Sequence, residues 1–213
     1  MPLSFSLKYI LIILASIFFI FISISGVLFF ILKHDYIYEY NLNFYPITER
    51  TSLEIEEIRE INSQIKNYFF DETEFLEVSI FNEKEIYHMK DVKDIINNLF
   101  LYGKLSSVVF VIIALICVKK YKVRIYSVFK ASSIVYSAVL LALAIGFLIS
   151  FNKLFIIFHE IAFSNDLWKL NINEDYLLMM YPENFFRDIA LLILIFSISI
   201  NFFLFFAFKS LKK

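Results

Sequence analysis

Hydrophobic residues are gathered in four long runs, and charged residues border each run. The runs are Tyr9 to Leu32, Ile95 to Val118, Ala131 to Asn152 and Ile189 to Phe208. The first, third and fourth hold no charged residue over 24, 22 and 20 positions. A helix needs about 20 residues to cross a hydrocarbon core of about 30 Å. The pattern therefore predicts four transmembrane helices.

The second run is interrupted by Lys104, which leaves 14 uncharged residues up to Val118. At about 1.5 Å of rise per residue, that stretch is too short to cross by itself. We therefore expect its helix to begin before Leu99. The Lys104 amine is expected to reach the nearer interface while its methylene groups stay in apolar surroundings.

Two other interpretations of the apolar runs are weaker. A soluble helical core is disfavoured because 60% of the residues are hydrophobic and 19% are aromatic, well above ordinary globular composition. A cleaved signal peptide is disfavoured because the 24 apolar positions of the first run exceed the usual length of about 7 to 15, and no A-x-A site follows. The first run is expected to remain as an anchor.

The charges between the runs predict the orientation of the chain. The connection 119–130 carries five cations and no acid, and short cationic loops stay on the cytoplasmic side. Four crossings then place both termini inside. Segment 33–103 holds 7 basic and 15 acidic residues, segment 153–186 holds 2 and 5, and both are expected to face outward. These outward segments show no basic patch of the kind that binds nucleic acid.

The first outward segment is predicted to form a small cap. Aromatic or apolar side chains recur at every second position of 36–44, which is the period of a half-buried strand. A capping-box pattern at Thr51 to Glu54 leads into apolar positions at helical spacing up to Phe69, which predicts an amphipathic helix. Alternation at 76–80 predicts a second strand, and 82–84 has the composition of a turn.

The predicted fold class is thus an α-helical membrane protein with four transmembrane helices and a small mixed α/β extracytoplasmic cap. The chain is expected to lie in the cell membrane as a multi-pass protein. The predicted segments are the N-terminus with the first membrane helix (1–32), the cap (33–94), the second membrane helix (95–118) and a cytoplasmic loop (119–130). The third membrane helix (131–152), an extracytoplasmic loop (153–188), and the fourth membrane helix with a cytoplasmic tail (189–213) follow.

Two of the three histidines fall at outward ends of predicted membrane helices. His88 precedes the second helix and His159 follows the third, so a four-helix bundle can bring them together although 70 positions separate them. The alternatives are a surface histidine at His88 and a partly buried, hydrogen-bonded histidine at His159. His34 is interpreted as interfacial. The lone cysteine, Cys117, cannot form an intrachain disulfide.

Two segments resemble the lipoprotein intramolecular transacylase family, Lit, of Gram-positive bacteria. The first is HMKDVK at 88–93 and the second is FHEIAFSNDLWKLNINEDYLLMMYPENFFRD at 158–188. The second is the more specific, because a histidine and three short motifs follow in order: Asp166-x-Trp168, Asp175-x-Leu177 and Pro182-Glu183-x-Phe185-Phe186.

The resemblance implies an enzyme that uses no cofactor and acts on diacylated bacterial lipoproteins in the membrane. It implies transfer of the sn-2 acyl chain from an S-diacylglyceryl cysteine onto the N-terminal amine, which leaves a lyso-form lipoprotein. The two family histidines match His88 and His159. Amine attack on an ester needs a base, because an α-amino group is mostly protonated at neutral pH, and imidazole suits that task.

We expect His159 to be the principal base and His88 to be the partner acid or the group that stabilises the oxyanion, although the roles can be exchanged. The candidates to orient an imidazole are Asp91, Glu160 and Asp166. The candidates to stabilise negative charge are Lys93, Lys104 and Arg187, and the candidate to contact the substrate is Trp168. Each also has a purely structural interpretation, as a helix cap or an interfacial anchor.

Three other functions are compatible with parts of the sequence. Histidines and carboxylates could bind a divalent metal, but His159-Glu160 is not followed by the second histidine of an H-E-x-x-H motif, and we predict no metal. A non-enzymatic sensor or scaffold would suit the acidic, aromatic segment 35–85. A transporter is disfavoured because the apolar runs lack paired charges and breaks near the midplane.

Overall fold

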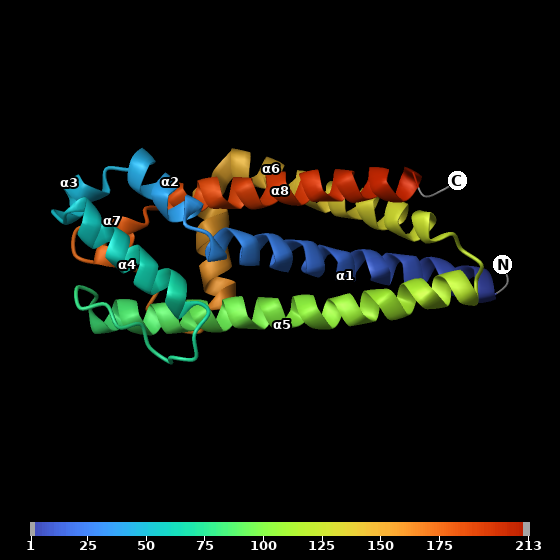
Figure 1. Ribbon diagram of the computed structural model, residues 1–213, viewed down its shortest axis with the longest axis horizontal. Helices are drawn as coiled ribbons and strands as arrows, with labels where there is room; N and C mark the ends of the chain where they lie inside the picture. The colour runs from blue at the N-terminus through green and yellow to red at the C-terminus, as the bar shows by residue number, and fades with distance from the viewer. Residues whose placement is uncertain (1–2, 211–213) are drawn as a thin grey trace. The chain divides into compact units, whose positions relative to one another are not determined.

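The computed structural model describes residues 3–210. This part of the chain folds into eight helices (Figure 1): α1 (Leu3–Lys33), α2 (Tyr36–Phe44), α3 (Ile47–Thr51), α4 (Ile55–Tyr68), α5 (Glu83–Lys119), α6 (Ile125–Ala162), α7 (Tyr176–Met180) and α8 (Glu183–Ser210). No strand occurs among these described residues. The mixed α/β cap predicted from the sequence is therefore wrong, and the fold is all-helical.

Four helices, α1, α5, α6 and α8, are long and apolar enough to cross a membrane. Helix α5 begins at Glu83, which confirms that the second apolar run belongs to a helix starting well before Leu99. Helix α6 contains one non-helical residue, Ser150, with φ −162° and ψ 80°. The chain divides into two compact units, with 1–28, 99–148 and 191–213 in unit one, and 29–98 and 149–190 in unit two.

The core of unit one is built from apolar side chains of α1, α5, α6 and α8. Phe19 packs 5.7 Å from Phe110 and makes an edge contact at 5.7 Å with Tyr136, as measured between ring centroids. A Cβ atom on Gly103 would lie 2.5 Å from the Cβ atom of Ser25. Only glycine therefore fits where α5 approaches α1, as is common where membrane helices pack closely.

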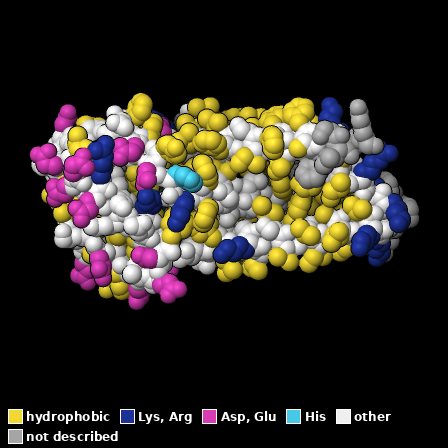
Figure 2. Space-filling model, viewed as in Figure 1, with side chains coloured by type: hydrophobic (Ala, Val, Ile, Leu, Met, Phe, Trp, Pro, Cys, Tyr) yellow, Lys and Arg dark blue, Asp and Glu magenta, His cyan; other side chains and the backbone are white. Residues whose placement is uncertain are grey.

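Apolar side chains also cover the surface of unit one. Leu148 and Phe203 are 79% and 73% exposed, and Figure 2 shows hydrophobic side chains spread along the helices. Lys and Arg gather around the two termini and the α5–α6 connection in the same view. Such a surface suits lipid rather than water, because soluble monomers rarely expose apolar patches of this extent.

In unit two, the predicted strand at 36–44 is instead helix α2. Its buried residues are Ile37, Tyr38 and Asn41, which lie on one helical face, whereas Tyr36 and Phe44 are 79% and 71% exposed. The alternating pattern predicted a strand wrongly because a tyrosine side chain can be either buried or exposed. The burial of one tyrosine therefore does not determine whether the residue two positions away is buried. The amide of Asn41 donates to the Met180 carbonyl at 2.8 Å, which ties α2 to the end of α7.

The second predicted strand, 76–80, is an extended and turn segment without strand pairing. Leu76 and Val78 are buried there, so the alternating pattern correctly predicted that these two apolar side chains are buried. The predicted amphipathic helix is confirmed as α4, whose Ile58, Ile61 and Ile65 are buried at helical spacing.

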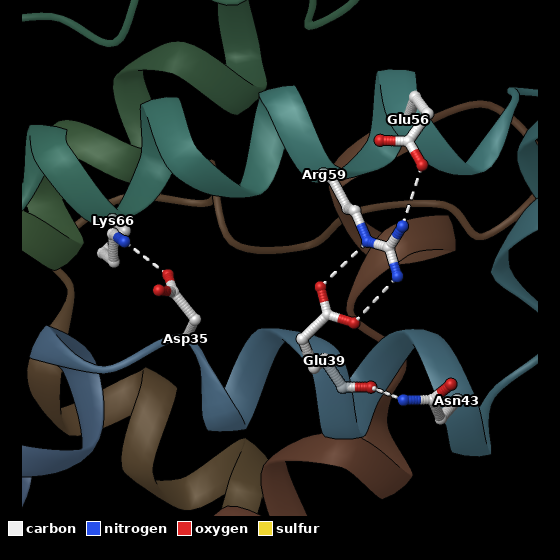
Figure 3. A network of polar contacts seen from close by, with 6 residues as sticks. All are labelled: Asp35, Glu39, Asn43, Glu56, Arg59 and Lys66. Carbon is white, nitrogen blue, oxygen red and sulfur yellow. Dashed lines mark hydrogen bonds and ion pairs between the residues drawn. The ribbon is translucent and has the colours of Figure 1, made fainter.

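Helices α2 and α4 are joined at the surface by a polar network (Figure 3). Arg59 binds both carboxylate oxygens of Glu39, at 3.0 and 3.2 Å, and also reaches Glu56 at 2.8 Å. Lys66 forms an ion pair with Asp35 near the other end of the same face. Because Arg59 and both its partners are exposed, these pairs orient the helices more than they stabilise them.

Candidate functional site

The position of His88 is set by the start of α5. Asn82 and Glu85 form a capping box there: the Asn82 N–H donates to the Glu85 carboxylate at 2.7 Å, and the Glu85 N–H donates to the Asn82 side-chain oxygen at 3.1 Å. The other Glu85 oxygen accepts the Leu177 N–H at 2.5 Å. One fully buried carboxylate thereby holds the N-terminal ends of α5 and α7, and His88 follows less than one turn later.

His159 lies in the last turn of α6. Its Nδ1 is 2.7 Å from the carbonyl oxygen of Phe155, one turn earlier in the helix. A carbonyl only accepts hydrogen bonds, so Nδ1 carries the proton. In the neutral ring the lone pair is then on Nε2, which can accept a proton from another group.

The structure brings the two imidazoles together. Their ring centroids are 6.2 Å apart with planes inclined at 33°, and the residues are only 7% and 8% exposed. The Nδ1 atom of His88 is buried and has no hydrogen-bond partner among the described residues. A buried nitrogen without a hydrogen-bond partner lowers the stability of the fold. At a functional site, such a nitrogen can form its hydrogen bond with a substrate instead.

Aromatic rings surround this pair. Around His159, the centroid of Phe155 lies at 4.3 Å and that of Trp168 at 5.0 Å. Phe163 contacts both imidazoles, at 5.1 Å from His88 and 5.5 Å from His159. Such apolar surroundings disfavour the charged imidazolium. The site can therefore hold a neutral base next to an apolar chain.

Of the seven supporting residues predicted from the sequence, Trp168 lies against His159, while Asp91, Asp166 and Glu160 show other contacts than those expected. The Asp91 carboxylate accepts a hydrogen bond from Asn165 at 2.8 Å. Asp166 pairs with Lys169 at 2.7 Å, and Glu160 is exposed. None of these three has a described hydrogen bond to an imidazole.

The two predicted cationic residues of unit two also bind other groups. Lys93 donates to Asp71 at 2.9 Å and to the Thr73 carbonyl at 2.7 Å, with its ammonium 4.0 Å from the centre of the Tyr68 ring. Arg187 pairs with Asp188 at 3.2 Å. Neither cation has a described contact with an imidazole, and the role expected of them toward negative charge stays a prediction.

Sequence reasoning missed a second polar cluster in unit two. Asp188, near the start of α8, accepts hydrogen bonds from Tyr40 at 2.8 Å and Tyr45 at 2.5 Å. Burial and its hydrogen bond to Asp188 raise the pKa of Tyr45, and a separate hydrogen bond to Asp188 raises the pKa of Tyr40. Both phenols therefore remain protonated donors. The tyrosine-rich stretch was the available signal, but it was interpreted as a strand.

No group of three or more histidine, cysteine or acidic residues within the described residues is arranged to hold a metal ion.

A family model supplies the decisive comparison. The model described as "Lipoprotein intramolecular transacylase Lit" matches residues 9–186. The chain belongs to the Lit family. It is therefore a lipoprotein intramolecular transacylase, an acyltransferase, and lipoproteins are its substrates. No match to a curated protein sequence was found.

Solved structures of Lit from Bacillus cereus are similar to this chain. One structure of that membrane-integral protein has a TM-score of 0.82 and 22% identity, over 97% of this chain and 98% of the other. A variant of the same protein with a histidine changed to alanine gives 0.81 and 21%, over 97% and 94%. With 22% identity and a TM-score of 0.82, the comparison shows that this chain and the Bacillus cereus protein share a fold. The four long apolar helices of this Lit family member are accordingly those of a multi-pass membrane protein.

Proposed function

We propose that this Lit family member moves the sn-2 acyl chain of an S-diacylglyceryl-cysteine lipoprotein onto the N-terminal amine, by acid/base catalysis at His88 and His159. The observation that carries the proposal is the buried pair of imidazoles at 6.2 Å. At that distance the reactive amine can hydrogen-bond one imidazole while the leaving oxygen hydrogen-bonds the other. The surrounding aromatic rings suit the acyl chain that is transferred.

In the proposed step, the N-terminal ammonium first gives one proton to water, and Nε2 of His159 takes a second proton from the nitrogen as the free amine attacks the ester carbonyl. The hydrogen bond from Nδ1 to Phe155 supports this role, because it leaves the lone pair on Nε2 and orients the ring. His88 donates a hydrogen bond to the oxyanion. The glyceryl C–O bond then breaks, and the proton goes to the departing oxygen.

The atoms balance without any cofactor: an amide bond forms, an ester bond breaks, and the product has the mass of the substrate. A positioned base contributes about 10²- to 10⁴-fold to the rate. Holding amine and ester in one bound molecule contributes more, since effective molarities reach about 10⁵ to 10⁸ M in well-oriented systems. Positioning is therefore expected to outweigh proton transfer.

The test is expression of the chain together with a diacylated lipoprotein, followed by mass spectrometry and amine labelling of its N-terminal lipopeptide. Transfer leaves the mass unchanged while the amine stops reacting. His159→Ala and His88→Ala are expected to leave the amine reactive. The matched control is His34→Ala, because His34 is the third histidine and hydrogen-bonds the Phe30 carbonyl at an exposed position. Retention of a reactive amine with the unaltered, inserted protein would refute the proposed reaction.

We also propose that both termini and connection 119–130 are cytoplasmic and that the histidines act on the extracytoplasmic side. The cationic, acid-free composition of that connection supports this orientation. Single cysteines placed by Asn173→Cys or Lys119→Cys in a Cys117→Ser background test it. An impermeant maleimide should label Asn173→Cys in intact cells and Lys119→Cys only after permeabilisation. The reverse pattern would invert the orientation.

A further inference from the structure

An open hollow in unit one is lined by α1, the connection between α5 and α6, and the start of α6. Its volume is about 670 Å³, and four cations line it: Lys8, Lys122, Arg124 and Lys130. The last three are exposed. Tyr126 and Ser127, from the first turn of α6, also line this hollow. Like charges gathered in this way repel one another unless an anion lies among them.

The sequence of unit one supplies no such anion. All 21 acidic residues of the chain fall within 29–98 and 149–190, whereas unit one contains ten lysines and arginines and no aspartate or glutamate. No side-chain carboxylate of this unit can therefore neutralise the hollow.

The backbone adds to the positive potential. Helix α6 begins at Ile125 beside the hollow and has no acidic residue in its first turn. The first N–H groups of a helix lack intrahelical partners and carry a partial positive charge, which favours phosphate.

The turn before α6 is held in one shape. Lys122 adopts the left-handed region at φ 53°, which is unusual for a side chain other than glycine. The Val123 N–H donates to the Cys117 carbonyl at 3.0 Å, and Val123 and Cys117 are both buried. The cations on either side of Val123 are thus presented by a fixed backbone, so less freedom is lost when an anion binds.

The surface beside the hollow is apolar. On α1, Ile10 and Ile13 are 49% and 55% exposed, and on α6, Ile134 is 60% exposed. A ligand with a negative headgroup and acyl chains matches both surfaces at once. We propose that this hollow binds the phosphate of an anionic phospholipid in the leaflet that the α5–α6 connection faces.

The test uses the full chain in phosphatidylcholine nanodiscs that contain spin-labelled phosphatidylglycerol or spin-labelled phosphatidylcholine. Electron paramagnetic resonance measures the fraction of each label that is immobilised by the protein. Unaltered protein should prefer phosphatidylglycerol several-fold. Arg124→Gln should reduce that preference about fivefold, because one cation near an anionic lipid surface contributes about that much.

Lys119→Gln is the matched control, since it removes one charge from the same end of the membrane but does not line the hollow. Its preference should fall by much less than that of Arg124→Gln, because Lys119 does not contact a phosphate that is held in the hollow. Circular dichroism checks that both variants remain helical. Equal losses in the two variants would show a diffuse charge effect and would overturn the site, as would the absence of any preference in the unaltered protein.

Inorganic phosphate added to the same nanodiscs distinguishes a lipid from a soluble anion. The proposal predicts that it fails to displace the labelled phosphatidylglycerol. Full displacement would assign the hollow to free phosphate and overturn the lipid assignment.

Discussion

Removal of the Glu85 carboxylate is expected to loosen the helix end that carries His88. Glu85 is fully buried and accepts the backbone N–H groups of Asn82 and Leu177, at 2.7 and 2.5 Å. Glu85→Ala leaves both donors without this partner. A buried donor left unsatisfied costs about 1 to 3 kcal/mol. That cost applies to the buried Leu177 N–H, whereas the Asn82 N–H is only part-buried and its loss is that of a helix cap, about 0.5 to 2 kcal/mol. The expected loss of unfolding free energy is therefore about 1.5 to 5 kcal/mol.

Titration of the protein from neutral micelles into sodium dodecyl sulfate, followed by circular dichroism, measures this loss. Glu85→Gln keeps one carbonyl acceptor, so it should retain about half of the stabilisation. Glu83→Ala is the matched control, because Glu83 is an exposed acid in the first turn of the same helix. It should change the unfolding free energy by at most about 0.5 kcal/mol. Equal unfolding curves for Glu85→Ala and Glu83→Ala would refute the assignment of Glu85 as the group that holds α5 and α7.

Three further outcomes are expected. Gly103→Ala should destabilise the protein by about 1 to 3 kcal/mol, because the new Cβ atom would lie 2.5 Å from that of Ser25. Adding Ser25→Gly to this variant should restore most of the lost stability in the same titration, whereas an unchanged unfolding midpoint for Gly103→Ala alone would contradict the close packing. Trp168→Ala should lower the rate of acyl transfer by on the order of tenfold by loosening His159, while Trp168→Phe, which keeps an aromatic ring, should transfer at close to the normal rate; equal rates for the two variants would argue against a positioning role. Arg59→Ala should leave the unfolding midpoint unchanged, because Arg59 and its partners are exposed, and a clear drop would mean that the network in Figure 3 stabilises the fold.

The membrane helices could be predicted from the sequence because long apolar runs have few alternatives to helices in lipid. Every backbone donor and acceptor must be satisfied within the segment there, so hydrophobicity and length are sufficient. The overall charge pattern was equally readable, because it needs only residue types. Helix α4 was also predicted, since its apolar positions follow one face over 14 residues.

The cap was predicted less well because its segments are short. A nine-residue stretch such as α2 fits both a strand and a helix when tyrosines occupy half of its positions. The contacts that decide between the two, such as Asn41 with the Met180 carbonyl, join residues 139 positions apart. Local periodicity contains no information about such a partner.

The candidate site was predicted in part. His88 and His159 were identified from their motifs and their places at the ends of helices, and Trp168 from its motif. The Phe155 carbonyl and the Phe163 ring were not, because a carbonyl has no signature in the sequence and phenylalanine is abundant, with 27 in the chain. The contacts of Asp91 and Lys93 were not foreseeable either, because their partners Asn165 and Asp71 lie 74 and 22 positions away.

The imidazole pair is proposed to catalyse acyl transfer within one lipoprotein molecule. The most direct measurement is the rate at which purified protein in nanodiscs converts a synthetic diacylated lipopeptide, with His159→Asn compared with the unaltered chain. Catalysis by His159 predicts formation of an amide at constant mass, and a rate about 10²- to 10⁴-fold lower for His159→Asn. An unchanged rate for that variant would contradict it.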